Sequence, residues 1–280
     1  VEKTPFLGGN TAQLDRVFPT GEKAGDLIAK LAAEVMANPN IEILTCAEVT
    51  EFQGYVGNFH LKIARRPVRS SEDAEKLARF KTAGVVGAAF VPFIGILPMG
   101  VPKGEPGEVV ERDLETGAVI MATGFNHYTP KRDEYGYGTF PEVITLPDLI
   151  KVMATTEGDA LVVNGHPVNS MAMVHCVGSR HIPGISEPGG NGVLNEYCSR
   201  VCCTATLQAA LEVKERFPET VIYDLYRDIR TYGRGHEEYY VNASRQGVLF
   251  VRFEPQDPPV ISKADPGDEA VLKVAVKDTL

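Results

Sequence analysis

Four of the five cysteines lie between residues 173 and 211, and their type and spacing could hold a metal. These four are Cys176, Cys198, Cys202 and Cys203, in the pattern Cys-x21-Cys-x3-Cys-Cys, and Cys46 lies outside the group. Thiolates are the usual ligands of iron–sulfur clusters and are common ligands of zinc. The group of four therefore indicates a metal centre more strongly than any single cysteine does.

Other interpretations of the cysteines stay open at this point. Structural zinc sites usually place their thiols in pairs about two to four residues apart, a spacing that adjacent Cys202 and Cys203 match poorly. A redox-active disulfide between these two neighbours is another interpretation. Simple burial is a further one, because free cysteine is among the most buried residue types. Spacing alone favours an iron–sulfur cluster without excluding zinc, a thiol pair or buried cysteines.

The residues around the cysteines predict a strand, a turn and a helix. Residues 170–175 form a short, largely apolar run, which predicts a buried strand. After Tyr197, no glycine or proline follows until Pro218, and apolar residues recur at helical spacing, so we expect a helix that begins near Cys198. Cys198 and Cys202 would then share one face of its first turn, with Cys203 beside them. The positive end of the helix would stabilise clustered thiolates there.

Strands and helices continue to alternate after this helix. We expect a strand at 221–226, a helix at 235–244 and a strand at 247–253, a pattern typical of a parallel, Rossmann-like sheet. No Gly-x-Gly-x-x-Gly opens the cysteine helix, so a pyridine nucleotide is not expected there.

Charged residues flank the expected site. Arg227, Asp228 and Arg230 follow the end of a strand, where they would form either an electrostatic shell for a cluster or a surface ion-pair group. His175 directly precedes Cys176 and should point to the opposite face of its strand, which favours core packing over metal ligation.

The first half of the chain predicts shorter elements. A helix is expected at 25–37, a strand at 41–45, and two strands within 48–62 joined near Gly54 and Gly57. A hairpin at 108–117 and a buried strand at 118–124 would follow. Further on, we expect a short helix at 147–153 and a hairpin at 161–168 with an Asn-Gly turn.

Several motifs together resemble a known family. The segments VEKTPFLGGNTAQL, ATGF, EYGYG, CVGSR, YCSRVCC and YRDIRTYGRGHEEYY are similar, in the same order, to the A-type flavoprotein subunit of heterodisulfide reductases. CVGSRHIPGISEP and TATLQAALEVKERFPET look most similar to the related flavoprotein of the quinone-interacting membrane-bound oxidoreductase, which serves adenylylsulfate reductase. The resemblance covers nearly the whole chain. It implies that the four cysteines bind a [4Fe-4S] cluster.

The resemblance also implies an α/β, three-layer fold of the thioredoxin-reductase-like kind, with two dinucleotide-binding domains and FAD in the full-length protein. Residues 1–160 would form a partial FAD-binding domain that lacks the first glycine motif, residues 161–256 a Rossmann-like domain with the cysteines, and residues 257–280 strands returning toward the FAD domain. The expected FAD contacts are Glu2, Lys3, Gly8, Gly9, Val49, Ala122, Thr123 and Gly124. From local sequence alone, Glu2 would be a surface residue in a charged turn.

Composition and chain ends limit the classes of function. The net charge of −9 and the absence of a basic run argue against nucleic-acid binding. The chain has no initiator methionine and opens on an apparent strand end, so we expect an internal fragment that holds little FAD and is inactive alone. The apolar segment 83–101 contains four glycines and two prolines, which favours a buried loop or a partner-facing surface over a membrane span.

The cysteine pattern and the family resemblance together predict an electron-transfer flavoprotein that passes electrons between FAD and a [4Fe-4S] cluster in an anaerobic redox complex of sulfur or sulfate metabolism. Its expected partners are other redox subunits of a membrane-associated or soluble complex, and a homodimer is a further expectation. The clustered, odd-numbered cysteines suit a reducing compartment, so we expect a cytoplasmic protein, peripheral to the inner membrane through its partners. The alternative is a non-redox scaffold whose cysteines bind zinc or are buried.

Overall fold

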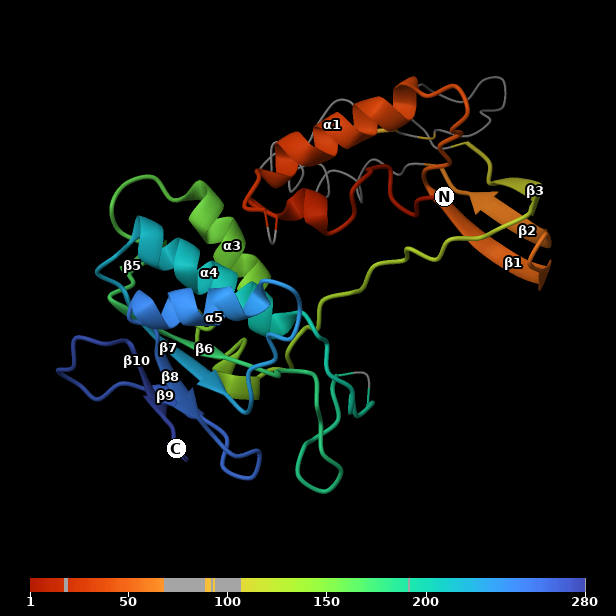
Figure 1. Ribbon diagram of the computed structural model, residues 1–280. Coiled ribbons are helices and arrows are strands. Elements are labelled where there is room, and N and C mark those ends of the chain that lie inside the picture. The colour runs from red at the N-terminus through yellow and green to blue at the C-terminus, as the bar shows by residue number, and fades with distance from the viewer. Residues whose placement is uncertain (18–19, 68–88, 92, 94–106, 191, 280) are drawn as a thin grey trace. The chain divides into compact units, whose positions relative to one another are not determined.

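A computed structural model of the chain describes residues 1–17, 20–67, 89–91, 93, 107–190 and 192–279 (Figure 1). The chain divides into two compact units, Val1–Phe125 and Asn126–Leu280. Both units mix helices and strands, which agrees with the predicted α/β class at that level. This division falls at residue 125, and residues 257–280 lie in the second unit. The predicted domain boundaries near residues 160 and 256 stay predictions.

The first unit contains one long helix and one antiparallel sheet. Helix α1 (Ala24–Ala37) follows a short 3-10 helix, η1 (Thr11–Gln13), and ends just before Pro39, as the sequence predicts. The sheet has the order β1-β2-β3, and its strands are β1 (Ala47–Tyr55), β2 (Asn58–Arg65) and β3 (Val110–Thr116). Two small cores hold this unit, one around Phe6 and Ile28 and one around Leu44 and Ile63.

Three predicted elements of the first unit are wrong. Residues 41–45 form no strand, and residues 108–117 contribute the single strand β3, paired with β2, instead of a hairpin. Residues 118–124 are extended chain without strand pairing, with Ile120 92% and Met121 75% exposed. A buried strand needs neighbours on both sides, and the described residues provide none for this segment.

The apolar segment predicted at 83–101 lies mostly outside the described residues. Its described part is 89–91 and 93, and residues 89–91 run beside residues 5–7, where the amide of Leu7 donates to the carbonyl of Ala89 and the amide of Val91 donates to the carbonyl of Pro5. Phe6 and Phe90 pack with ring centroids 5.1 Å apart. None of the helices in the described ranges has the length and apolar character that crossing a membrane requires.

The second unit is built on a parallel sheet with the order β6-β7-β8. The chain alternates through β6 (Ser170–Val174), α4 (Cys202–Arg216), β7 (Val221–Tyr226), α5 (His236–Arg245) and β8 (Leu249–Arg252). Right-handed connections between neighbouring parallel strands place their helices on the same face. Figure 1 shows α4 and α5 together on one side of this sheet, joined by α3 (Leu146–Thr155). The predicted alternation of strands and helices is confirmed.

The main core lies between this sheet and its helices. Its largest members, Met153, Leu207, Ile222 and Phe217, are each at most 2% exposed. Met171 and Met173 on β6 and Ile222 on β7 contribute to it, so alternate residues of each strand face the helices. The same alternation carries His175 and Asp224 into the protein interior.

Smaller elements complete the second unit. A 3-10 turn, η2 (Glu134–Gly136), precedes α3. Strands β4 (Val162–Val163) and β5 (His166–Pro167) form the predicted hairpin, and both residues of its Asn164-Gly165 turn have positive φ. Strands β9 (Val260–Lys263) and β10 (Leu272–Ala275) pair with each other in antiparallel fashion. Their predicted return toward an FAD domain stays a prediction.

The N-terminus of α3 offers a test of local helix stability. The Thr145 side chain caps the helix by accepting from the Asp148 amide. Replacing Thr145 with alanine removes this acceptor and should lower the free energy of unfolding by about 1 kcal/mol, measured by denaturant titration. Thr155→Ala at the exposed opposite end should change the free energy by less than about 0.5 kcal/mol. Equal losses in the two variants would contradict the capping role.

Candidate metal centre

Cys176, Cys202 and Cys203 meet at the C-terminal edge of the parallel sheet. Cys176 follows the end of β6 and has a left-handed backbone with φ of 63°. Cys202 and Cys203 are the first two residues of α4. The C-terminal ends of parallel strands and the N-terminus of the following helix commonly form ligand sites, because the free helix amides and the helix dipole favour negative charge.

The sulfur atoms are close enough to share protons. The ligand atoms of His175, Cys202 and Cys203 all lie within 4.8 Å of one another. Hydrogen bonds from the thiols of Cys176 and Cys203 lower the pKa of Cys202, and the same bonds raise the pKa of Cys176 and Cys203. The thiols of Cys202 and Cys203 and the imidazole of His175 therefore form a compact donor set for a soft metal or an iron–sulfur cluster, and Cys176 adjoins this set through its hydrogen bond with Cys202.

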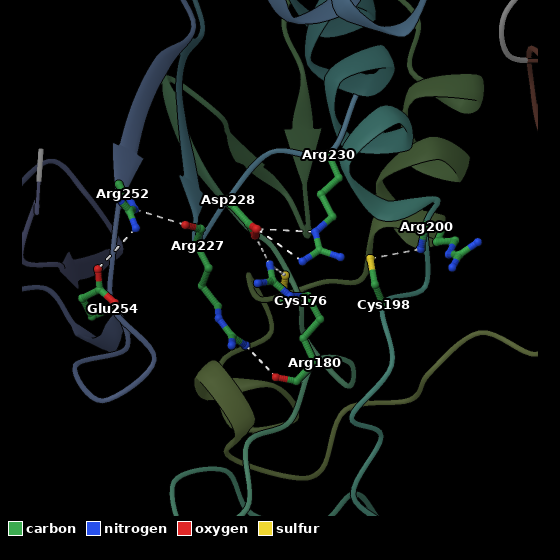
Figure 2. A network of polar contacts seen from close by, with 9 residues as sticks. All are labelled: Cys176, Arg180, Cys198, Arg200, Arg227, Asp228, Arg230, Arg252 and Glu254. Atoms are coloured by element: carbon green, nitrogen blue, oxygen red, sulfur yellow. Dashed lines mark hydrogen bonds and ion pairs between the residues drawn. The ribbon is translucent and has the colours of Figure 1, made fainter. Parts of the chain in front are cut away.

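Cys198 lies apart from this group, on the loop before α4. Its sulfur accepts a hydrogen bond from the Arg200 amide at 3.4 Å, as Figure 2 shows. The predicted helix start at Cys198 is wrong, because Arg200 has a left-handed backbone with φ of 61° and helical geometry begins at Cys202. The structure thus brings together three of the four predicted ligands and leaves Cys198 on the adjoining loop.

His175 and Asp224 form a buried pair behind the thiols. His175 is 2% exposed and Asp224 is fully buried, and the Nε2 atom of His175 lies 2.9 and 3.1 Å from the two carboxylate oxygens. Burial alone would lower the pKa of His175, but the Asp224 carboxylate and nearby Cys202 outweigh burial and raise it. The predicted core location of His175 is correct. The sequence did not predict that His175 also lies close to Cys202 and Cys203.

Arginine side chains approach the cysteines from the loops (Figure 2). The Nη1 atom of Arg180 lies 3.6 Å from the Cys176 sulfur, and Arg180 also forms an ion pair with Asp228. Asp228 contacts Arg230, and Arg227 donates to the carbonyl of Arg180 at 2.9 Å. The contact with the Cys176 sulfur is made by Arg180, and Asp228 forms ion pairs with Arg180 and Arg230. Both interpretations of Arg227, Asp228 and Arg230 therefore stay predictions.

Arg180 is a site residue that the sequence-based predictions lack. It lies four positions after Cys176 in the CVGSR motif, and the turn at Gly178 directs the chain back toward the sulfur. The motif carried the signal, because an arginine placed beyond a tight turn can reach back to the residue before the turn. Its cationic head stabilises thiolate at Cys176.

The predicted FAD residues all lie in the first unit. Glu2 donates its amide to Leu44 and accepts from Thr4, and Lys3 pairs with Glu48 at 2.7 Å. Glu48 directly precedes Val49, which is 45% exposed. The structure therefore brings Lys3 close to the strand that carries Val49.

The two predicted glycine loops of the FAD set also approach each other. Gly8 has φ of 102°, and a Cβ atom there would lie 2.7 Å from the Ile28 side chain, so only glycine fits. Gly9 has φ of 53°. The neighbouring Asn10 side chain donates to the Phe125 carbonyl at 2.7 Å, next to the exposed stretch 122–124.

Curated proteins match the chain over most or all of its length. It is 34% identical to the first of two A-type iron–sulfur subunits of CoB–CoM heterodisulfide reductase in Methanopyrus kandleri, covering all of this chain and 46% of that protein. It is 32% identical to the A-type component of the H(2):CoB-CoM heterodisulfide,ferredoxin reductase of Methanothermobacter marburgensis, covering all of this chain and 46% of that protein. For the A-type component of the ferredoxin/F(420)H(2)-dependent CoB-CoM heterodisulfide reductase of Methanosarcina acetivorans, the identity is 34%, with 90% of this chain and 36% of that protein covered.

The agreement extends across both units of the structure. No protein-family model matches the chain. The relatives nevertheless share one designation, the A-type component of heterodisulfide reductase, and the name of the Methanopyrus kandleri protein describes an iron–sulfur subunit. The chain belongs to the family of A-type heterodisulfide reductase subunits and spans about half the length of the curated relatives that it matches.

Proposed function

We propose that the chain carries a [4Fe-4S] cluster on Cys176, Cys198, Cys202 and Cys203 and passes electrons between this cluster and FAD within an anaerobic redox complex. The observation that carries this proposal is the convergence of three thiols at the start of α4. The family relationship supports it, because the Methanopyrus kandleri relative is described as an iron–sulfur subunit. The cluster would supply one-electron chemistry, and the protein would supply its ligands and surroundings.

Each ligand has a distinct structural support. Cys202 and Cys203 are held by α4, whose free amides and positive end favour anionic sulfur. Cys176 is held by the end of β6 and faces the guanidinium of Arg180. Cys198 completes the predicted set from a loop that leads directly into α4.

A cavity of about 450 Å³ adjoins Cys176 and His175. Its wall carries basic and acidic side chains in equal number, namely Lys131, Arg132, Arg227, Asp133, Glu134 and Glu187. The choice of a cluster over a single zinc ion therefore rests on the cysteine pattern and on the family relationship, not on this cavity.

The FAD half of the proposal draws on the first unit. A thioredoxin-reductase-like flavin fold would place Glu2 and Lys3 at the adenosine ribose and Gly8 and Gly9 near the flavin. Val49 would face the adenine, and Ala122, Thr123 and Gly124 would form the second contact. The left-handed backbones of Gly8 and Gly9 support this assignment, because such turns allow the close approach that a dinucleotide needs.

The partners in this proposal are other redox subunits. The relatives are named as A-type components of heterodisulfide reductases, which implies further subunits in those proteins. By the same analogy, this chain would work in a cytoplasmic or membrane-peripheral complex of sulfur or sulfate metabolism. The resemblance to the quinone-interacting oxidoreductase flavoprotein and the homodimer remain predictions.

Metal analysis tests the proposal directly. We expect anaerobically purified protein to contain about four iron atoms and four acid-labile sulfides per chain. Reduction of the cluster should give an electron paramagnetic resonance (EPR) signal. Zinc without iron would contradict the proposal and favour the scaffold alternative. A protein that folds normally without any metal would favour the interpretation that the cysteines are simply buried.

A further inference from the structure

The buried pair of His175 and Asp224 needs an explanation other than stability. Both side chains are fully buried. Removing two charged or polar groups from water costs several kcal/mol each, and apolar residues of similar volume often stabilise a core equally well. A buried pair in the main core of the second unit therefore points to a role at the neighbouring site.

The geometry leaves one ring nitrogen of His175 open. The Nε2 atom faces the Asp224 carboxylate at 2.9 Å. The Nδ1 atom is buried and has no hydrogen-bond partner among the described residues. A ring nitrogen of His175 lies within 4.8 Å of the sulfurs of Cys202 and Cys203. Because Asp224 occupies Nε2, Nδ1 is the nitrogen left for an interaction with them.

The backbone holds the imidazole in this position. The amide of His175 donates to the carbonyl of Leu225 at 2.9 Å, which extends the pairing of β6 with β7 by one residue. Asp224 lies on β7 next to Leu225, and its carboxylate contacts the Nε2 atom on the other side of the ring. A ring fixed both by its backbone and by a carboxylate can present Nδ1 in one direction only.

We propose that Asp224 positions His175 so that its Nδ1–H donates a hydrogen bond to the cysteine sulfurs of the cluster at Cys202 and Cys203, and that this bond raises the reduction potential of the cluster. The inference rests on the proposed cluster. In this arrangement Nε2–H would donate to the Asp224 carboxylate and Nδ1–H to sulfur, so the proposal takes both ring nitrogens of His175 as protonated. A donor aimed at sulfur stabilises the more negative, reduced cluster, because hydrogen bonds to sulfur are among the determinants of cluster potential.

The test compares cluster potentials in variants of the cluster-loaded protein. His175→Leu combined with Asp224→Ala removes the donor and its carboxylate together and leaves no unpaired buried charge. We expect the equilibrium constant for cluster reduction to fall at least tenfold, equal to about 59 mV for a one-electron couple, in an EPR-monitored redox titration. His175→Gln retains a neutral N–H donor and should show a smaller fall. His166→Gln, at an exposed histidine of β5, should leave the potential unchanged.

The outcomes separate the inference from the proposed function. An iron-loaded double variant with an unchanged potential would overturn the inference and leave the cluster in place. Loss of iron from both His175 variants, or a strong nitrogen hyperfine coupling in protein labelled with ¹⁵N-histidine, would also overturn it, because His175 would then be a ligand. Absence of iron from the unmodified protein would instead refute the proposed function.

Discussion

Replacing Cys202 with serine should remove the cluster, with iron content falling at least tenfold and the EPR signal disappearing. Cys202 is the central sulfur of the group, hydrogen-bonded to both Cys176 and Cys203, and it stands at the start of α4. A serine hydroxyl is a poor replacement because it is hard to deprotonate and lacks the softness of a thiolate. Iron and sulfide assays with EPR of the reduced protein measure the effect.

Cys46 provides a matched control for this substitution. It is a buried cysteine of the first unit, and it lies outside the group of four cysteines in the sequence. Cys46→Ser should retain the iron content of the unmodified protein. Equal iron in the Cys202 and Cys46 variants would show that the cluster is not where we propose it.

Replacing Gly178 with alanine should destabilise the second unit and disturb the cysteine site. Gly178 has φ of 72°, and a Cβ atom there would lie 2.1 Å from the Tyr128 ring. The ring is not free to move aside, because its hydroxyl donates to Glu134 at 2.8 Å. The left-handed backbone costs an L-residue about 1–2 kcal/mol, and overpacking adds about 1–3 kcal/mol.

Unfolding and iron content together measure this effect. We expect a lower midpoint of thermal unfolding and reduced iron per chain, since Gly178 forms the turn that follows Cys176. Gly190→Ala is the control, because its Cβ would meet no atom within 4 Å and its backbone is not left-handed. A Gly178 variant as stable as the Gly190 variant would contradict the packing described here.

The parallel sheet could be predicted because its signals are local. Residues 170–175 and 221–226 are short apolar runs, and the helices between the strands show their own periodicity. The segment 118–124 carries a similar apolar run, yet it forms no strand. Whether this segment forms a strand depends on the presence of neighbouring strands, which the local sequence pattern does not reveal.

The cysteine site was predictable in its residue types and less so in its geometry. Cys198 and Cys202 would share a helical face only in an unbroken helix, and the left-handed backbone of Arg200 interrupts it. Strand alternation correctly placed His175 in the interior. It could not show that Cys176, past the strand end and with positive φ, turns back toward the same thiols.

The backbone around these thiols has a consequence for the order in which the protein matures. Cys176, Arg180 and Arg200 all adopt the left-handed region, which disfavours each by about 1–2 kcal/mol. No non-glycine residue of the parallel sheet or of helices α3, α4 and α5 has a positive φ, so these elements can form without that cost. In the proposed function, bonds from these loops to the cluster would compensate for part of this strain. In a newly made chain, the sheet and helices of the second unit would therefore fold first. The cluster would bind last and fix the conformation of the ligand loops.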